Sequence, residues 1–382
     1  MAAPGVVLKG QTIRFVADPF AVPPDDALAH EAKGAVWMAA GRIQAVGPAA
    51  EVLAAAGPDA EVVDHGDAIL APGFVDCHVH YPQLAAIASY GTQLLEWLET
   101  YTFPAERRFE DPVHARAGAE FFLDECLRNG TTTACVYPTS HPGSVDSFFE
   151  AATARGMRMA CGKVLMDRNA PSFLRDDAQS GYDDSKALIA RWHGAGRNVY
   201  AITPRFAPTS TEAQMAAAGA LWREHPDALV QSHLSENTDE IAWVRDLFPD
   251  AADYFDVYER FGLAGPGAIY GHGVHLTPRE RAAIAETGTA IAHCPTSNLF
   301  IGSGLFDLKG LRTAAPAVEV GLATDVGGGT SLSMFKTMRA AYEVAQLSGF
   351  NLHPVQAWHL ATVGAARAMR MADRVGIGAP DD

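Results

Sequence analysis

The chain has 382 residues, and 29 Lys and Arg stand against 45 Asp and Glu, which gives a formal net charge of −16. Hydrophobic residues make up 48% and charged residues 19%, a composition typical of a globular protein with a substantial core rather than of a disordered or fibrous chain. Such a negative charge argues against nucleic acid as the main partner.

The sequence predicts neither a membrane span nor a secretory signal. Its longest apolar runs are broken by Gly, Pro or charged residues well before the ~18 residues that a transmembrane helix needs. Residues 1–10 contain a single Lys and no long apolar segment. The five cysteines are widely spaced and form no C-x-x-C pair, which is typical of reduced thiols, so we expect a cytoplasmic protein.

The first 72 residues are rich in β-forming residues and turns. Strands are predicted at 6–8, 12–16, 35–38 and 42–46, the last two as a hairpin around Ala40-Gly41. This segment is too short to bury a sheet alone. We therefore expect residues 1–72 to form a small β-sandwich-like domain that a short return of residues 371–382 completes.

Residues 73–370 alternate apolar strands with amphipathic helices. Strands are predicted at 74–80, 131–137, 158–166, 199–204, 228–233, 268–272, 290–294 and 319–324, with helices at 113–128, 144–155 and 212–224 among those that follow them. Eight strand–helix units predict an α/β fold of the (β/α)8 TIM-barrel type. A doubly wound sheet is the alternative, but it requires a Gly-rich phosphate loop at an early strand, and none is present.

Polar side chains gather at the predicted carboxyl ends of the barrel strands, where barrel enzymes carry their reactive residues. His78 and His80 end the first strand, and alternation along a strand points both to the same side. His233 ends the fifth strand, and Asp325 ends the eighth, where a carboxylate is costly unless it is paired or bound to metal. Three His and one Asp suit Zn²⁺ or Fe²⁺ and leave a position for water.

Further polar residues near these strand ends receive different interpretations. Glu236 follows His233 by three residues and can reach the same space without binding the metal, and His272 lies between two glycines that let the backbone approach a ligand. His293 and Cys294 are expected to pack against the site or to support its ligands rather than to bind the metal. A second, bridged metal would call for a Lys at the end of the fourth strand, where the chain has Thr203-Pro204-Arg205, so the site is predicted to hold one metal.

Seven segments carry a resemblance to known proteins: 74–83, 97–106, 129–135, 162–167, 203–206, 232–237 and 293–298. They resemble the amidohydrolase superfamily and, within it, the guanine deaminases. The H-x-H and H-x-x-E patterns mark only the superfamily, whereas Tyr81-Pro82-Gln83 and Pro204-Arg205-Phe206 are similar to guanine deaminases specifically.

The resemblance implies a role for each candidate residue. His78, His80, His233 and Asp325 are implied to bind one Zn²⁺ per chain, with Fe²⁺ as the alternative. The implied catalytic residues are Glu236 as the proton shuttle, Asp325 as acceptor of the water proton, and His272 orienting the water. Gln83, Arg205 and Phe206 are implied to hold the purine, with Phe206 offering apolar surface to the flat base.

The implied reaction is the hydrolytic deamination of guanine to xanthine and ammonia in purine catabolism, by a homodimer without nucleic-acid or membrane partners. A deaminase of another amino-heterocycle, such as a pterin, a triazine or a modified purine, would keep the metal ligands and change Gln83 and Arg205. A non-catalytic relative should have lost metal ligands, and a cytidine-type zinc deaminase is excluded because no P-C-x-x-C is present. Family members continue into further β-strands after a segment like Gly376-Ile377-Gly378, so we expect either an abridged C-terminal return or a truncated sequence.

Overall fold

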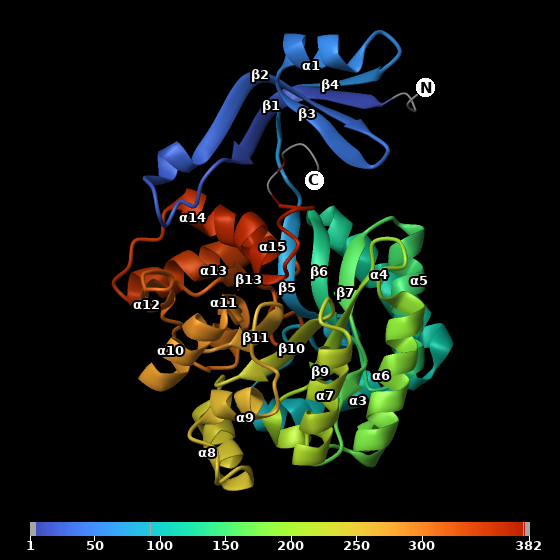
Figure 1. The fold of residues 1–382 in the computed structure, drawn as a ribbon, viewed down its shortest axis with the longest axis vertical. Helices are drawn as coiled ribbons and strands as arrows, with labels where there is room; N and C mark the ends of the chain where they lie inside the picture. The colour runs from blue at the N-terminus through green and yellow to red at the C-terminus, as the bar shows by residue number, and fades with distance from the viewer. Residues whose placement is uncertain (1–4, 92, 377, 379–382) are drawn as a thin grey trace.

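The computed structural model describes residues 5–91, 93–376 and 378. A four-stranded N-terminal sheet stands at one end of a barrel of parallel strands that is surrounded by helices (Figure 1). None of the helices within these residues combines the length and the apolar character that a membrane crossing requires.

The barrel strands follow one another around the sheet in chain order, and all the pairs between neighbours are parallel. They are β5 Phe74–His80, β6 Thr131–Tyr137, β7 Arg158–Cys161, β9 Val199–Pro204, β10 Leu229–Leu234, β11 Ala268–His272, β12 Ala290–His293 and β13 Val320–Leu322. The chain after β13 meets β5, because the Asp325 backbone N–H donates to the His78 carbonyl at 2.9 Å and the Thr324 N–H donates to Asp76 Oδ1 at 3.0 Å. The (β/α)8 barrel predicted from the sequence is confirmed.

The third predicted strand, 158–166, is interrupted. Its first part is β7, and its second part is the short β8 Val164–Leu165, which pairs with the end of β9. Gly162 lies so close to the Ala201 carbonyl that a side chain would collide with it, and the next N–H, that of Lys163, donates to the Tyr200 hydroxyl at 3.1 Å. The backbone therefore leaves the ladder for two residues and rejoins it farther along β9.

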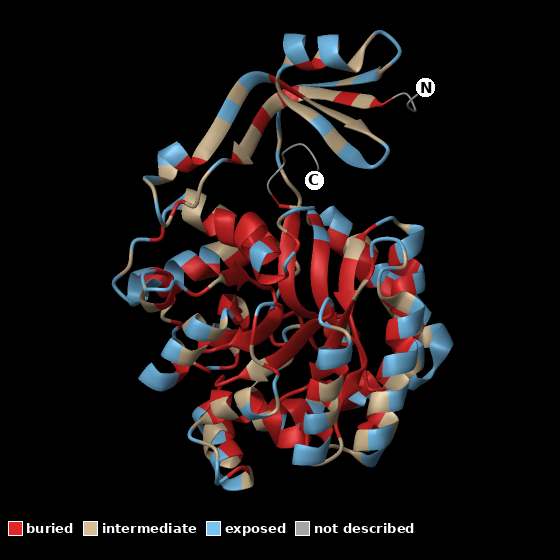
Figure 2. Ribbon diagram, viewed as in Figure 1, coloured by how far each residue is buried: buried red, intermediate tan, exposed pale blue. Residues whose placement is uncertain are grey.

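Helices cover the outside of the barrel, and their outward faces are exposed while the strands are buried (Figure 2). The helices of at least six residues are α4 Pro112–Arg128, α5 Pro142–Ala154, α6 Ala178–Trp192, α7 Glu212–Glu224, α8 Thr238–Leu247, α9 Tyr254–Arg260, α10 Pro278–Thr287, α11 Pro295–Phe300, α13 Met334–Leu347, α14 Pro354–His359 and, in the N-terminal part, α1 Ala49–Ala56. The three helices predicted at 113–128, 144–155 and 212–224 are confirmed to within two residues as α4, α5 and α7. Asp111 explains the start of α4, because its carboxylate accepts a hydrogen bond from the Val113 N–H at 3.0 Å.

The N-terminal part differs in detail from the prediction. Its strands are β1 Val6–Phe15, β2 Leu28–Ala39, β3 Arg42–Pro48 and β4 Glu61–Leu70, in the order β3-β2-β1-β4. The segments 6–8 and 12–16 belong to one strand with an irregularity between Gly10 and Thr12, and β4 and α1 were not predicted. The predicted hairpin is confirmed, with Ala40 at φ 51° and Gly41 at φ 75°, as its two-residue turn requires.

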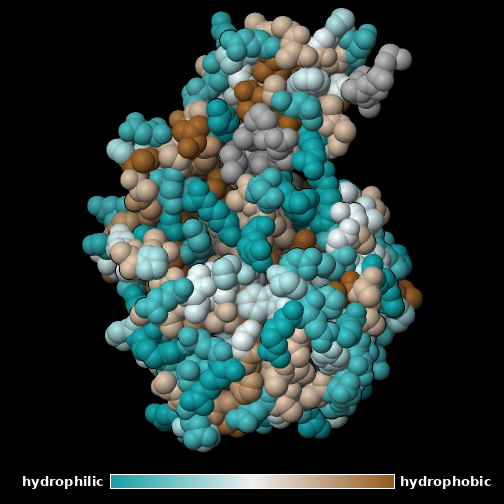
Figure 3. Space-filling model, in the orientation of Figure 1, coloured by the Kyte–Doolittle hydropathy of each residue, from teal (hydrophilic) through white to brown (hydrophobic). Residues whose placement is uncertain are grey.

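The expectation of a β-sandwich is corrected for the described residues. They form a single sheet with α1 on one face, and the core between them is small, centred on Val7, Ala35 and Val52. Strand β4 is exposed along most of its length, including Val62 and Ile69. Apolar brown patches are visible over this upper part of the molecule, whereas the barrel surface below is mostly hydrophilic (Figure 3). So short a sheet buries too little apolar area to carry much of the stability by itself.

The last described residues lie against the base of the barrel. Met371 and Val375 pack with the apolar cluster under the strands, and no described residue beyond Ala368 belongs to a helix or strand. Of the predicted return 371–382, residues 377 and 379–382 lie outside the described residues, and the division into 1–72, 73–370 and 371–382 stays a prediction. An ion pair between Asp18 and Arg312, 2.7 Å long, ties the N-terminal part to the barrel.

Candidate active site and metal centre

The predicted site residues come from different strands and meet at the carboxyl end of the barrel. His78 and His80 lie on β5, His233 lies on β10, His272 ends β11, and Asp325 follows β13. Parallel strands bring their carboxyl ends to the same rim, so residues separated by up to 247 positions become neighbours. Each of these side chains is almost entirely inaccessible to solvent, apart from the half-buried His233.

The predicted metal ligands form one compact group. One potential ligand atom from each of His78, His80, His233 and Asp325 lies within 4.8 Å of the others. Asp325 Oδ1 is 3.3 Å from Nε2 of His78 and 3.3 Å from Nε2 of His80, and Nε2 of His233 is 3.3 Å from Nε2 of His80. These contacts place four donor atoms around a common point, which is the arrangement that a four-coordinate divalent cation needs.

The protonation of the imidazoles suits a cation. His233 Nδ1 lies 2.7 Å from the Arg205 carbonyl oxygen, which can only accept, so Nδ1 carries the proton and Nε2 is left with its lone pair. Burial lowers the pKa of His78, lowers that of His80 to about 3, and lowers that of His233 well below its usual value. Neutral imidazole is the form that binds metal.

The remaining polar atoms of this group also match a bound cation. Burial favours the neutral form of Asp325, but the neighbouring imidazoles of His78 and His80 outweigh it and hold the pKa of Asp325 well below the usual range. Both ring nitrogens of His78 are buried without a hydrogen-bond partner among the described residues. A buried polar atom without a partner is costly, and a metal ion supplies the missing interaction.

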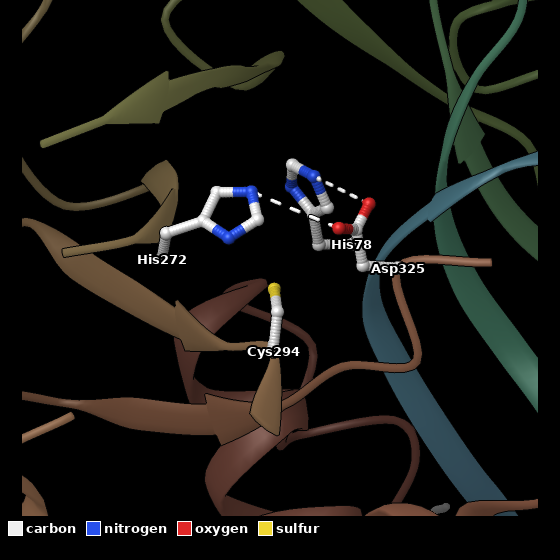
Figure 4. Close-up of side chains that lie close together, drawn as sticks. All are labelled: His78, His272, Cys294 and Asp325. Atoms are coloured by element: carbon white, nitrogen blue, oxygen red, sulfur yellow. Dashed lines mark ion pairs between the residues drawn. The ribbon is translucent and has the colours of Figure 1, made fainter. Parts of the chain in front are cut away.

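A second group overlaps with the first. Ligand atoms of His78, His272, Cys294 and Asp325 also lie within 4.8 Å of one another, and Figure 4 shows both rings and the Cys294 sulfur directed toward the same space as the Asp325 carboxylate. Burial, and then the charge of Asp325, raises the pKa of the Cys294 thiol, which donates to the Ala292 carbonyl at 3.3 Å. Since sulfur ligates as thiolate, the group of three His and one Asp fits a divalent cation better.

Glu236 lies beside this group. Its Oε2 is 3.4 Å from His272 Nε2, and its Oε1 accepts a hydrogen bond from the Ser303 hydroxyl at 3.2 Å. Burial, reinforced by the negative charge of Asp325, raises the pKa of Glu236 to about 8. A carboxyl group that titrates near neutrality can both release and accept a proton during a reaction.

His272 is held in a defined orientation. Its Nδ1 lies 2.8 Å from Asn298 Oδ1, an amide oxygen that accepts a hydrogen bond, so Nδ1 is the donor and Nε2 faces Glu236 and Asp325. His272 has φ 74° and Asp325 has φ 46°, both in the left-handed region that non-glycine residues rarely adopt. Such backbone strain is concentrated at functional sites, where the surrounding structure enforces it.

A cavity opens onto these residues. The three predicted substrate residues, Gln83, Arg205 and Phe206, line it together with Trp97. The remaining lining residues are His80, Leu94, Leu98, His233, Glu236, His272, Ile301, Asp325 and Gly328. Every residue predicted for the site except His78 therefore borders the cavity, and His78 lies directly behind it.

Two residues of the site were not singled out from the sequence. Glu106 contacts Gln83 and Arg205, and Asn298 contacts His272. Each is the last residue of a segment that carries the family resemblance: Glu106 ends 97–106, and Asn298 ends 293–298. This position was the only signal in the sequence that pointed to them. The ring of His293 stacks on Phe306 at 4.3 Å between centroids, and His293 is absent from both groups of potential metal ligands. Lys163 is buried in an ion pair with Asp176, away from the cluster.

The sequence signature of the Amidohydrolase family matches residues 69–380. This chain belongs to the amidohydrolase family. Guanine deaminase of Escherichia coli (strain K12) is 52% identical over 315 residues, which cover 82% of this chain and 71% of that protein. Among solved amidohydrolase relatives, guanine deaminase from Bradyrhizobium japonicum superposes with a TM-score of 0.96 at 37% identity, covering 100% of this chain and 86% of that one. Guanine deaminase from C. acetobutylicum, solved with guanine bound in the active site, gives a TM-score of 0.88 at 27% identity over 98% of this chain and 88% of that one.

Proposed function

We propose that this amidohydrolase converts guanine and water into xanthine and ammonia. The observation that supports it most directly is the convergence, in one cavity, of a metal-ligand group, the proton-carrying Glu236 and the polar pair Arg205 and Gln83. The relatives at 35–52% identity that carry the name guanine deaminase support the same substrate. In this reaction the water oxygen bonds to C2, the bond from C2 to the amino nitrogen breaks, and the amine leaves as ammonia.

His78, His80, His233 and Asp325 are proposed to hold one Zn²⁺, with Fe²⁺ as the alternative. Three nitrogens and one carboxylate oxygen match the borderline character of both ions, and the neutral imidazoles need no deprotonation to bind them. When bound, such an ion supplies a water activated for attack near neutral pH.

Protons are proposed to move between three residues of the chain. Asp325 accepts the first proton of the water, since its carboxylate is ionised and its Oδ2 faces His272 Nε2 at 3.8 Å. His272 orients the water, with Asn298 fixing its ring. Glu236 delivers a proton to a ring nitrogen and then to the departing amine, for which a pKa of about 8 is well matched.

Arg205, Gln83 and Phe206 are proposed to hold the purine. A guanidinium can only donate, so Arg205 matches the O6 carbonyl of guanine and opposes the amino group that adenine carries at that position. Phe206 is buried at the cavity wall and offers its ring surface to the flat base. The cytoplasmic location expected from the cysteines and the homodimer implied by the resemblance stay predictions.

The proposed function is tested with purified protein and a panel of guanine, adenine, 2-aminopurine, a pterin and an amino-triazine, with release of ammonia as the measurement. We expect guanine to have the highest kcat/KM, and the product to be identified as xanthine by chromatography. A pterin or a triazine that exceeds guanine would overturn the assignment in favour of the other amino-heterocycle deaminases.

We expect one equivalent of divalent metal per chain, because the group of three His and one Asp has no bridging side chain. Elemental analysis of active protein gives the count and the identity of the metal. Removal with a chelator should abolish ammonia release, and one equivalent of Zn²⁺ should restore it. Two tightly bound equivalents in fully active protein would contradict a mononuclear site.

A further inference from the structure

Glu106 is a fully buried carboxylate beside the active-site cavity, and neither metal binding nor proton transfer accounts for it. It lies on the short helix α3 Phe103–Arg107, which continues the helical segment that begins with α2 Leu94–Trp97. Both of its oxygens accept hydrogen bonds from Nη1 of Arg205, each at 2.9 Å. Its Oε1 also accepts a hydrogen bond from Nε2 of Gln83 at 2.9 Å. One carboxylate thus joins the two polar residues proposed to read the substrate.

The contact with Gln83 determines which end of its amide faces the carboxylate. An ionised carboxylate can only accept, so the group beside Glu106 is the NH₂ of Gln83 and not its carbonyl. The carbonyl oxygen, Oε1, is left without a hydrogen bond to any residue that the structure describes, and it lies against Gly327, whose neighbour Gly328 lines the cavity together with Gln83. Gln83 therefore offers the cavity an acceptor. Without Glu106, the amide could turn by 180° and offer a donor instead.

Arg205 is fixed by the same helix. Its guanidinium carbon lies 5.3 Å from the centre of the Phe103 ring, and its Nη1 is occupied by Glu106. Nη2 and Nε have no hydrogen bond within the described part of the chain, so donors remain for a ligand in the cavity that Arg205 lines. The contact of Nη1 with both carboxylate oxygens, together with the Phe103 ring beside the guanidinium, restricts the orientation of Arg205.

We propose that Glu106 is the positioning residue that sets the order of hydrogen-bond donor and acceptor on the substrate-reading wall, and that this order selects a lactam edge. A donor from Arg205 beside an acceptor from Gln83 is complementary to a carbonyl beside a ring N–H. Guanine presents that pair as O6 and N1–H. Adenine presents the reverse order, an amino group beside an unprotonated N1, and 2-aminopurine has no carbonyl at this edge. The inference rests on the proposed function, because it assumes that the purine occupies this cavity.

The main test compares Glu106→Gln with wild-type protein on guanine and on 2-aminopurine. Gln keeps the volume of Glu106, but its amide no longer requires the NH₂ of Gln83 to face it. We expect KM for guanine to rise by about 10-fold or more with a smaller change in kcat, and the preference for guanine over 2-aminopurine to narrow by at least about 10-fold. Metal content should not change. The matched control is Glu110→Gln, an exposed glutamate one turn farther on, which should leave both substrates unaffected.

A double-mutant cycle separates positioning from a general structural effect. If Glu106 acts partly through Gln83, then Glu106→Gln should lower the preference for guanine over 2-aminopurine by a smaller factor in a Gln83→Met background than in the wild type. If Glu106→Gln only impairs folding, its effect should be the same in both backgrounds. If Glu106→Gln does not fold, Gln83→Met alone still tests whether the Gln83 amide presents an acceptor to the substrate, since this variant leaves the Glu106–Arg205 ion pair in place. That variant should lose affinity for hypoxanthine, a lactam without the reacting amine, and lose none for purine, which has no carbonyl or N–H at this edge.

The failures of the two proposals are distinguishable. Wild-type protein that releases no ammonia from guanine would refute the proposed function. Wild-type protein that uses guanine, together with a Glu106→Gln variant whose preference for guanine over 2-aminopurine is unchanged, would refute the role of Glu106 alone. Equal loss of affinity for hypoxanthine and purine in Gln83→Met would show that the amide does not present an acceptor.

Discussion

Glu236→Gln is expected to lower kcat for guanine by about 10²–10⁴-fold, the usual cost of losing one proton-transfer group. The amide has nearly the same shape as the carboxyl group and can still accept from the Ser303 hydroxyl, which lies 3.2 Å from Oε1, so the cavity should keep its form. What it loses is the exchangeable proton that a group with a pKa of about 8 provides. The measurement is steady-state kinetics on guanine, with elemental analysis of the same sample.

The metal content of the Glu236→Gln variant distinguishes a role in proton transfer from a role as a metal ligand. Glu236 is absent from both groups of potential ligands, so the variant should bind as much metal as the wild type. The matched control is Asp239→Asn, three residues away on the exposed start of α8, which should change kcat by less than about twofold. A Glu236→Gln protein that is purified without metal would show that Glu236 is a ligand and that its assigned role is wrong.

Arg205→Met is expected to lower kcat/KM for guanine by about 10²-fold or more. The variant removes the donor proposed for O6, and a hydrogen bond from a charged group contributes about 1.5–3 kcal/mol. Metal should be retained, because Arg205 contacts the ligand His233 only through its backbone carbonyl. The difference in kcat/KM between guanine and amino-heterocycles without the oxo group should become smaller.

The structure adds a consequence for stability. Met at 205 leaves the Glu106 carboxylate buried without its cation, and breaking a buried ion pair from one side costs about 3–5 kcal/mol. A lower Tm of the single variant is therefore expected. The double variant Arg205→Met with Glu106→Gln removes the unpaired charge and should regain most of the Tm without regaining activity on guanine. Unchanged turnover of guanine by Arg205→Met, or equal turnover of adenine and guanine by the wild type, would show that Arg205 does not read the substrate.

Local sequence patterns determined most of the barrel and of the metal site. Apolar strands followed by amphipathic helices are recognisable because both periodicities are local, and the predicted boundaries of the barrel strands, apart from the interrupted third one, agree with the structure to within two residues. His78 and His80 were predictable as a pair because alternation along a strand is fixed by backbone geometry. His233 and Asp325 followed from a rule of the fold, since polar residues at the carboxyl ends of parallel strands share one rim.

The N-terminal part shows where local patterns were insufficient. The polar, exposed strand β4 and the Ala-rich helix α1 carry little amphipathic signal, and their placement depends on pairing with β1 and on a small shared core. Similarly, the break between β7 and β8 depends on the close approach of Gly162 to Ala201, which belongs to another strand. Neither contact leaves a periodic trace in the sequence.

Tertiary structure alone decided how the substrate side of the site is organised. Gln83, Glu106 and Arg205 come from three separate segments, and nothing in their spacing indicates that one carboxylate joins the other two. The orientation of the Gln83 amide, the tautomer of His233 and the raised pKa of Glu236 all depend on which groups lie within hydrogen-bond distance and on the exclusion of water. Residue types and strand periodicity determined which chemical groups reach the barrel rim, whereas hydrogen-bond partners and burial, which exist only after folding, determined their orientation and protonation.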